Sequence, residues 1–151
     1  MRRRLLINSN GGDNKKKYFT LTAVENGRFN FSNYLYYSTN SGTSWNYGSS
    51  VNVSAGNKVM WKGNLSPQSN YGIGYFSSTG GFEIEGNLGS LLWGDNYTGK
   101  TSLNGKNYAF NGLFKGCTKL ISIDNMALPF ETLSSACYKD MFSGCTSLAS
   151  R

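Results

Sequence analysis

The chain has 151 residues, of which 38% are apolar, 15% are aromatic and 19 are glycine; this length suits one ordinary domain, and the aromatic content excludes a disordered chain. The net charge of +7 includes six positive charges within the first seventeen residues, so it describes an N-terminal arm and does not predict a nucleic-acid-binding surface. No run approaches the roughly 20 apolar residues that span a bilayer, so we expect no membrane insertion.

The first seventeen residues form a basic arm that has too few apolar residues to build a core. Three arginines precede a short apolar run, and a Gly- and Asn-rich stretch leads to three lysines. Guanidinium groups make charge-assisted bonds to carboxylates, and the apolar run adds a hydrophobic contact. Two interpretations stay open: a solvated tail, or an anchor that docks into an acidic, partly apolar groove of a partner protein. The anchor would consist of Arg2, Arg3, Arg4, Leu5, Leu6 and Ile7.

From Tyr18 onward, runs of β-forming residues alternate with turns rich in Gly, Asn and Ser. The turns at 25–27 and 55–57 have the length and composition of hairpin connections. A third run, 82–85, alternates apolar and acidic residues, as a strand with one solvent-facing side does. The pattern predicts a mainly β fold, with a small antiparallel β-sandwich over residues 18–107. The expected strands are 18–24, 28–31, 35–38, 51–54, 58–63 and 82–85.

The last part of the chain, residues 108–151, contains a sequence repeat. The segment LFKGCTKL, which starts at residue 113, recurs as MFSGCTSL, which starts at residue 141. The offset between these two starting positions, which we call the repeat period, lies in the range of leucine-rich repeats. Each unit should place its Phe on a turn or short helix, bury its Cys and Leu, and then form a strand, as at 120–123. The predicted repeat core consists of Leu113, Phe114, Cys117, Leu120, Cys137, Met141, Phe142, Cys145 and Leu148.

The repeat resembles leucine-rich repeats of the BspA-like type, whose units carry a Phe-x-x-Cys-x-x-Leu signature before the strand. The resemblance covers residues 108–151, in which Leu128–Leu133 and Cys137-Tyr138 match the linking half of a unit. It implies one complete period and the opening of a second. The expected fold class is therefore mainly β, a small antiparallel β-sandwich followed by the start of a leucine-rich-repeat segment.

The stretches 42–45, 51–63, 82–87 and 94–97 look like modules that accompany such repeats in gut Bacteroides surface proteins and their phages. The Arg-Arg-Arg-Leu-Leu start is similar to phage virion proteins. This resemblance implies a virion location, with assembly in the host cytoplasm.

Three constellations could carry chemistry, and each has a simpler interpretation. Glu83 and Glu85 would lie about 7 Å apart on one strand face, which is more often a solvated face than a glycosidase pair. A Gly-flanked turn at 95–96 could offer oxygens to Ca²⁺ or form an Asx turn. The three cysteines have no histidine in the chain to complete a zinc site or serve as a base. We therefore expect buried free thiols, no metal, no cofactor and no enzymatic activity.

The aromatic residues between 34 and 76 could form a surface for sugar stacking or for a partner. A chain this poor in Leu, Ile and Val should instead bury most of them. They are Tyr34, Tyr36, Tyr37, Trp45, Tyr47, Tyr71, Tyr75 and Phe76. A candidate ligand surface remains in the 69–79 loop, formed by Tyr71, Tyr75 and Phe76.

Together these observations favour a non-catalytic virion structural or fibre protein of a bacteriophage, anchored by its arm and presenting its repeats for assembly or host attachment. The expected partners are other virion proteins, further copies of the chain, with a trimer favoured by the resemblance, and a host-surface glycan or protein. The alternative is an adhesion module of a bacterial cell surface.

Overall fold

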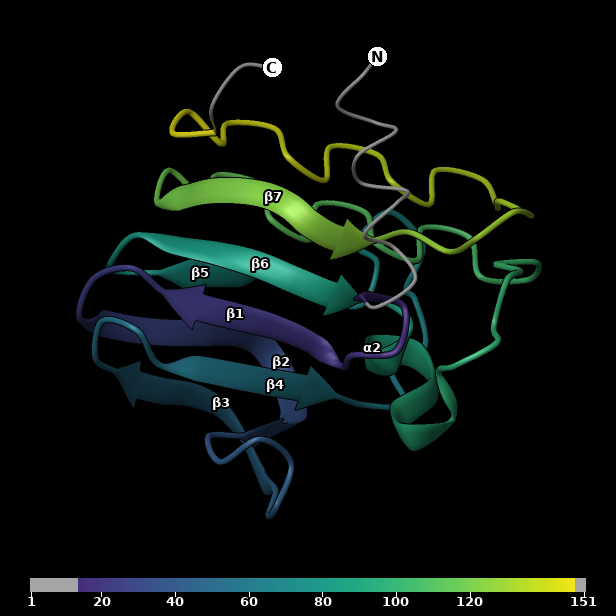
Figure 1. Cartoon of the computed structure of the whole chain (residues 1–151). Helices are drawn as coiled ribbons and strands as arrows, with labels where there is room; N and C mark the ends of the chain where they lie inside the picture. The colour runs from purple at the N-terminus through teal and green to yellow at the C-terminus, as the bar shows by residue number, and fades with distance from the viewer. Residues whose placement is uncertain (1–13, 149–151) are drawn as a thin grey trace.

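The computed structural model describes residues 14–148 and consists mainly of β-strands (Figure 1). The predicted mainly β class is therefore confirmed. One helical turn, α2 (Ser90–Trp93), and one turn of 3₁₀ helix, η1 (Gly94–Asn96), follow the sixth strand. The strands are β1 (Phe19–Ala23), β2 (Gly27–Ser38), β3 (Asn46–Val53), β4 (Lys58–Lys62), β5 (Phe76–Ser78), β6 (Phe82–Asn87) and β7 (Leu120–Ala127).

All seven strands belong to one mixed sheet in the order β3-β2-β4-β1-β6-β7, with β5 paired to β2 off this path. Of the pairings between these strands, only that of β6 with β7 is parallel. The long strand β2 pairs with β5 through Phe29–Phe31 and with β4 through Tyr36–Ser38. Because one edge of β2 serves two different neighbours, the sheet folds over on itself and acquires a sandwich-like shape with the core inside.

The two predicted hairpins at 25–27 and 55–57 are wrong. β1 pairs with β4 and β6 and not with β2, and β4 lies between β2 and β1. β1 is buried at four of its five positions, so burial favours a central place with a strand on each edge over a local hairpin. The predicted strands 28–31 and 35–38 also merge into one strand, which is irregular in register between Asn30 and Leu35.

One hydrophobic core extends from β1 to the last turns of the chain. Phe19, Phe82 and Trp61 from the sheet are fully buried, as are Phe110 and Phe114 from the C-terminal segment. β7, which belongs to residues 108–151, completes the sheet beside β6. The repeat segment and the strand module at 18–107 therefore stabilise each other through shared packing.

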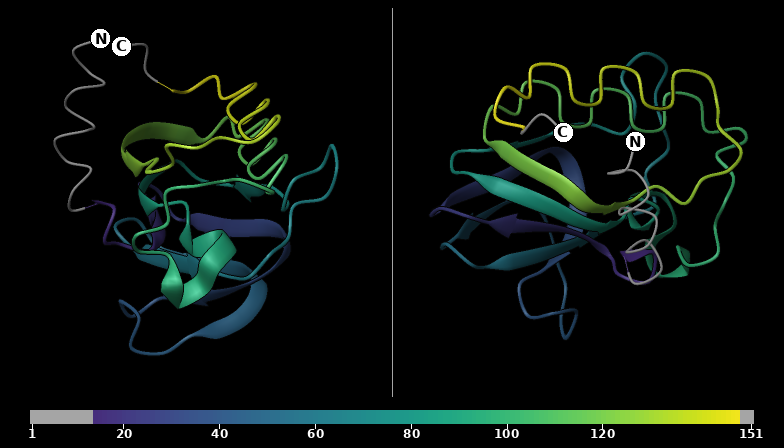
Figure 2. Two further views of the ribbon diagram at one scale, coloured as in Figure 1. Left: turned by 90° about the vertical axis from the view of Figure 1, so that its right-hand side faces the viewer. Right: turned by 45° about the horizontal axis from the view of Figure 1, so that its top comes forward.

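Two coils of consecutive turns lie side by side next to the sheet, coil 1 (residues 103–117) and coil 2 (residues 132–145) (Figure 2). Alternate amides of coil 1 donate to carbonyls of coil 2 over 2.7–2.9 Å, for example Phe110 to Cys137 and Phe114 to Met141. The intervening amides donate to carbonyls three residues back in their own coil. The backbone enters the left-handed region at 108, 112 and 116 and again one repeat period later, at 136, 140 and 144. The backbone conformation therefore recurs with the same period as the sequence repeat.

Aromatic ladders and thiols join the coils to the sheet. The rings of Phe76, Phe114 and Phe142 stack in sequence, with centroids 5.5 and 5.8 Å apart. The thiol of Cys117 donates to the Phe76 carbonyl and that of Cys145 to the Phe114 carbonyl, both over 3.0 Å. Phe76 lies on β5, so this strand serves as the layer on which coil 1 stacks.

The structure buries most of the predicted repeat core. Leu113, Phe114 and Leu120 are fully buried, Cys117, Cys137 and Met141 are nearly so, and Phe142, Cys145 and Leu148 are partly buried against the core. The three cysteines are free thiols, as expected. Burial raises the pKa of Cys117 to about 12, so this thiol is protonated at neutral pH and is a poor nucleophile.

Coil 2 has a row of backbone amides on its outer side. They are equivalent to the coil 1 amides that donate to coil 2. The two coils have equivalent backbone conformations and equivalent internal hydrogen bonds, so these amides point away from coil 1. Within residues 14–148, no backbone carbonyl accepts from the amides of residues 136, 138, 140, 142 and 144.

Candidate functional site

A cleft of about 380 Å³ opens where β4 ends and the segment from Trp93 to Asn96 crosses it. Aromatic rings from three parts of the chain face it, those of Tyr36, Trp45 and Trp93. We call this the aromatic cleft. Its remaining walls are formed by Lys62, Gly63, Asn64, Gly94, Asp95 and Asn96.

Hydrogen bonds fix the floor of the aromatic cleft. The amide of Gly63 donates to the Ser90 carbonyl over 2.9 Å, and that of Gly94 donates to the Gly63 carbonyl over 2.8 Å. A Cβ at position 63 would lie 2.6 Å from Leu35 Cδ2, so a larger residue would have to displace this buried side chain. The chain after β4 is thereby attached to the turn after α2, and this contact brings Trp93 to the same cleft as Trp45.

A charged network holds Trp45 in place. The ammonium of Lys62 lies 4.2 Å from the centre of the Trp45 ring, a cation–π distance, and 2.8 Å from Asp95 Oδ1. The Tyr18 hydroxyl donates to the same oxygen over 2.6 Å, and the Tyr18 ring contacts Trp45 with centroids 5.1 Å apart. No hydrogen bond among the described residues uses Asp95 Oδ2, so this oxygen can accept from a ligand.

The same network sets the protonation of its members. Hydrogen bonds from Lys62 and Tyr18 hold the pKa of Asp95 below its usual range. Burial, followed by the bond to Asp95, raises the pKa of Tyr18 to about 12. At neutral pH Asp95 is therefore a carboxylate and Tyr18 a neutral phenol, and the negative charge of Asp95 is paired with Lys62.

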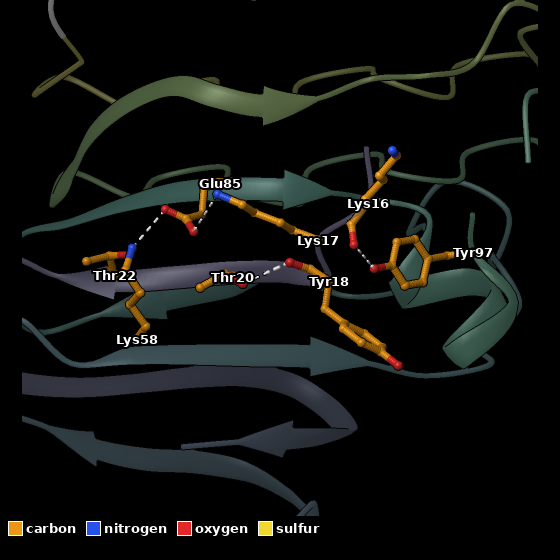
Figure 3. A network of polar contacts seen from close by, with 8 residues as sticks. All are labelled: Lys16, Lys17, Tyr18, Thr20, Thr22, Lys58, Glu85 and Tyr97. Carbon is orange, nitrogen blue, oxygen red and sulfur yellow. Dashed lines mark hydrogen bonds and ion pairs between the residues drawn. The ribbon is translucent and has the colours of Figure 1, made fainter. Parts of the chain in front are cut away.

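A second hollow of about 300 Å³ lies on the other side of Tyr18. Figure 3 shows how Lys17 and Lys58 both reach Glu85, at 3.8 and 2.9 Å. Lys58 also donates to Thr22 Oγ1 over 3.2 Å. We call this hollow the lysine groove; its walls are Lys16, Lys17, Tyr18, Thr20, Ser41, Lys58, Met60 and Glu85.

A third hollow of about 370 Å³ contains part of the predicted ligand surface. Tyr71 and Tyr75 are 78% and 56% exposed and face Asn111 and Lys115 of coil 1 across it. Phe76 is fully buried, so its assignment to a ligand surface is wrong. Phe76 is the first residue of β5, and the pairing of β5 with β2 places its side chain in the core.

The expectation that most of the eight aromatic residues are buried is also wrong. Five of them are exposed, and Trp45 is half-buried. Fully buried Phe and Leu residues together with Trp61 fill the core, so the tyrosines keep their hydroxyls in water. The five exposed residues are Tyr34, Tyr36, Tyr47, Tyr71 and Tyr75.

The other sequence-derived sites fall in different places. Glu83 is exposed, whereas Glu85 is half-buried between lysines. The turn residue Asp95, considered above for Ca²⁺, pairs with Lys62 in the aromatic cleft. Among residues 14–148 no group of three potential metal-ligating side chains occurs, and no helix is long and apolar enough to cross a membrane. The anchor residues Arg2, Arg3, Arg4, Leu5, Leu6 and Ile7 lie outside the described residues.

The aromatic cleft as a whole was not predicted from the sequence. Trp45 was considered for sugar stacking and Asp95 for a turn, but no local pattern connects them with Lys62 or Trp93. A Gly-flanked Asp-Asn turn directly after a tryptophan, at 93–96, is the one local signal that could have drawn attention to this site.

Comparison of the chain with protein-family models, with curated proteins and with solved structures gives no match.

Proposed function

We propose that this protein is a non-catalytic attachment module that binds a glycan in the aromatic cleft. The observation that carries the proposal is the fixed Trp45 ring, held by Lys62 at 4.2 Å beside the carboxylate of Asp95. Sugars combine apolar C–H faces with hydroxyl groups. A rigid aromatic ring next to oriented acceptors and donors suits both halves of such a ligand.

The composition of the cleft supports binding over hydrolysis. Glycoside hydrolysis ordinarily needs two carboxyl groups on opposite sides of the bond, about 5 to 10 Å apart. Among the described residues, the lining of the aromatic cleft contains one carboxylate, Asp95, and its pKa is lowered, which disfavours a role as a general acid.

The proposal is tested by titrating the full chain with an array of oligosaccharides and measuring affinities by calorimetry for those that bind. Trp45→Ala should weaken binding by about 30-fold or more, as expected for an aromatic residue that dominates an interface. Tyr71→Ala, which removes an exposed ring outside the cleft, is the matched control and should bind normally. Loss of binding in the Tyr71 variant alone would move the ligand to the 69–79 loop and contradict the proposal.

The attachment module belongs, on this proposal, to a fibre or other virion protein of a bacteriophage. Three features support this placement: the stacked coils, the basic arm, and the resemblance of the repeat to BspA-like leucine-rich repeats. The arm anchors the chain to other virion proteins, and the cleft faces the host surface. An adhesion module of a bacterial envelope is the alternative.

Mass spectrometry of purified phage particles and of bacterial envelope fractions distinguishes the two locations. The chain should be found in the particles. Recovery from envelope fractions alone would favour the adhesion module.

The outer side of coil 2 supports a role in assembly. Its outward amides can be paired by a polypeptide that presents a row of carbonyls at the same spacing, as edge strands are by an added strand. Two copies related by a twofold axis through this face would bring donors against donors. The homo-oligomer that we propose, with a trimer favoured by resemblance, can use this face only in a head-to-tail contact, in which the amides meet a different surface of the next copy.

A further inference from the structure

We infer that the glycan is acidic and that the lysine groove binds its anionic groups. This inference rests on the proposed function and deepens it, since it names the class of sugar. It is carried by the charge of the groove and by its position next to the aromatic cleft.

The groove and the cleft share the Tyr18 side chain. Tyr18 is part of the groove wall, its ring contacts Trp45, and its hydroxyl donates to Asp95. Ser41 also lies in the groove wall. The next residue, Gly42, packs against the Trp45 ring and Met60. An oligosaccharide stacked on Trp45 can therefore pass over Tyr18 and place its next units between the lysines.

The charge of the two hollows differs. In the aromatic cleft the ammonium of Lys62 is paired with Asp95. In the lysine groove the ammonium groups of Lys17 and Lys58 both meet one carboxylate, Glu85, whereas Figure 3 shows the side chain of Lys16 pointing away from it. Two positive charges against one negative charge leave an excess of one. This excess gives the groove a positive field that attracts anions.

The groove is built from fixed parts of the fold, as Figure 3 shows. The backbone at Lys16 and Lys17 is held by the Tyr97 hydroxyl, over 2.8 Å, and by the amide of Asn87, over 2.9 Å. Lys58 projects from β4 and Glu85 from β6, on either side of β1. Glu85 gathers two ammonium groups at one point, while the side chains of Lys17 and Lys58 stay 52% and 55% exposed. An incoming anion meets both groups without displacing a buried contact.

Carboxylate and sulfate groups share the required chemistry, because each offers charged oxygens to point-like ammonium groups. A single-stranded nucleic acid also combines negative charge with rings that stack on aromatic residues. Asp95 offers an acceptor oxygen beside Trp45, which suits a sugar hydroxyl because the hydroxyl can donate to it, whereas a phosphodiester group has no hydrogen to donate. The geometry therefore favours an acidic sugar.

The test compares matched ligands on the full chain by calorimetry at low salt. The ligands are oligogalacturonate and its methyl ester, dextran sulfate and dextran oligosaccharides, and oligo-dT. The acidic member of at least one sugar pair should bind about tenfold more tightly than its neutral partner, and added salt should abolish the difference. The two pairs distinguish a carboxylated from a sulfated ligand.

Variants locate the effect. Lys17→Gln combined with Lys58→Gln should remove the preference for the acidic sugar while neutral binding persists. Lys16→Gln removes a neighbouring charge whose side chain points away from Glu85, and it should leave most of the preference in place. Lys119→Gln combined with Lys139→Gln removes two exposed lysines of the C-terminal segment and should change nothing beyond a weak general charge effect.

The outcomes separate this inference from the proposed function. Equal binding of acidic and neutral sugars, both lost in the Trp45→Ala variant, would overturn the acidic ligand and leave the sugar-binding cleft in place. Absence of binding to every sugar would overturn both. Lysine-dependent binding of oligo-dT that exceeds binding of the sugars would replace the glycan with a nucleic acid.

Discussion

Replacement of Phe114 by alanine should lower the free energy of unfolding by about 3–5 kcal/mol, the usual cost of truncating a buried Phe. The side chain is fully buried. Its ring contacts Phe19 and Phe82 of the sheet, Phe76 of β5 and Phe142 of coil 2, at centroid distances of 5.5–6.5 Å. A cavity at this point separates the sheet from both coils, so it should reduce the stability of both.

Urea denaturation followed by intrinsic fluorescence and by circular dichroism measures this effect. Phe142→Ala is the matched control, because Phe142 occupies the equivalent position in the second unit and is only partly buried. Its cost should be clearly smaller. Equal costs at the two positions would contradict the view that Phe114 joins sheet and coils, as would an unfolding curve with two separate transitions in the wild-type protein.

Addition of one further repeat unit should raise the thermal midpoint of the protein. In this variant a second copy of residues 121–148 follows Leu148 directly, in place of residues 149–151, so that the repeat period continues unchanged. The copied strand can pair with β7, the last strand of the sheet among residues 14–148. The copied coil can offer carbonyls to the outward amides of coil 2. Each added kcal/mol should raise the midpoint by about 2–4 °C in a chain of this size.

Differential scanning calorimetry checks the result, and hydrogen exchange at the amides of residues 138 and 142 locates it. These amides should exchange more slowly once a further coil covers them. A variant extended by the same segment in shuffled order serves as control and should melt like the original chain. If the ordered copy leaves both the midpoint and these amides unchanged, the outer side of coil 2 is not a stacking surface.

The sequence by itself determined the features that depend on short patterns. Alternation of Phe82 and Ile84 with two glutamates predicted β6 because side chains of a strand alternate between its faces. The repeated Phe-x-x-Cys-x-x-Leu segment predicted which residues the coils bury, since equivalent turns one repeat period apart present equivalent side chains. The three free thiols followed from the absence of histidine and from the apolar character of cysteine.

Only the tertiary structure decided which strands pair and where the cleft lies. Short turns favoured hairpins, yet the apolar strand β1 is paired on both edges, with β4 and β6. The sequence places Phe76 in a loop. In the structure it lies on β5, and its ring stacks on Phe114 of coil 1. Tyr18 and Asp95, 77 positions apart, meet only because β1 and β4 are adjacent and the turn after α2 is bonded to the end of β4. Such long-range pairing follows from the packing of one core, in which each strand takes the neighbours that bury it best, and no short pattern in the chain records that choice.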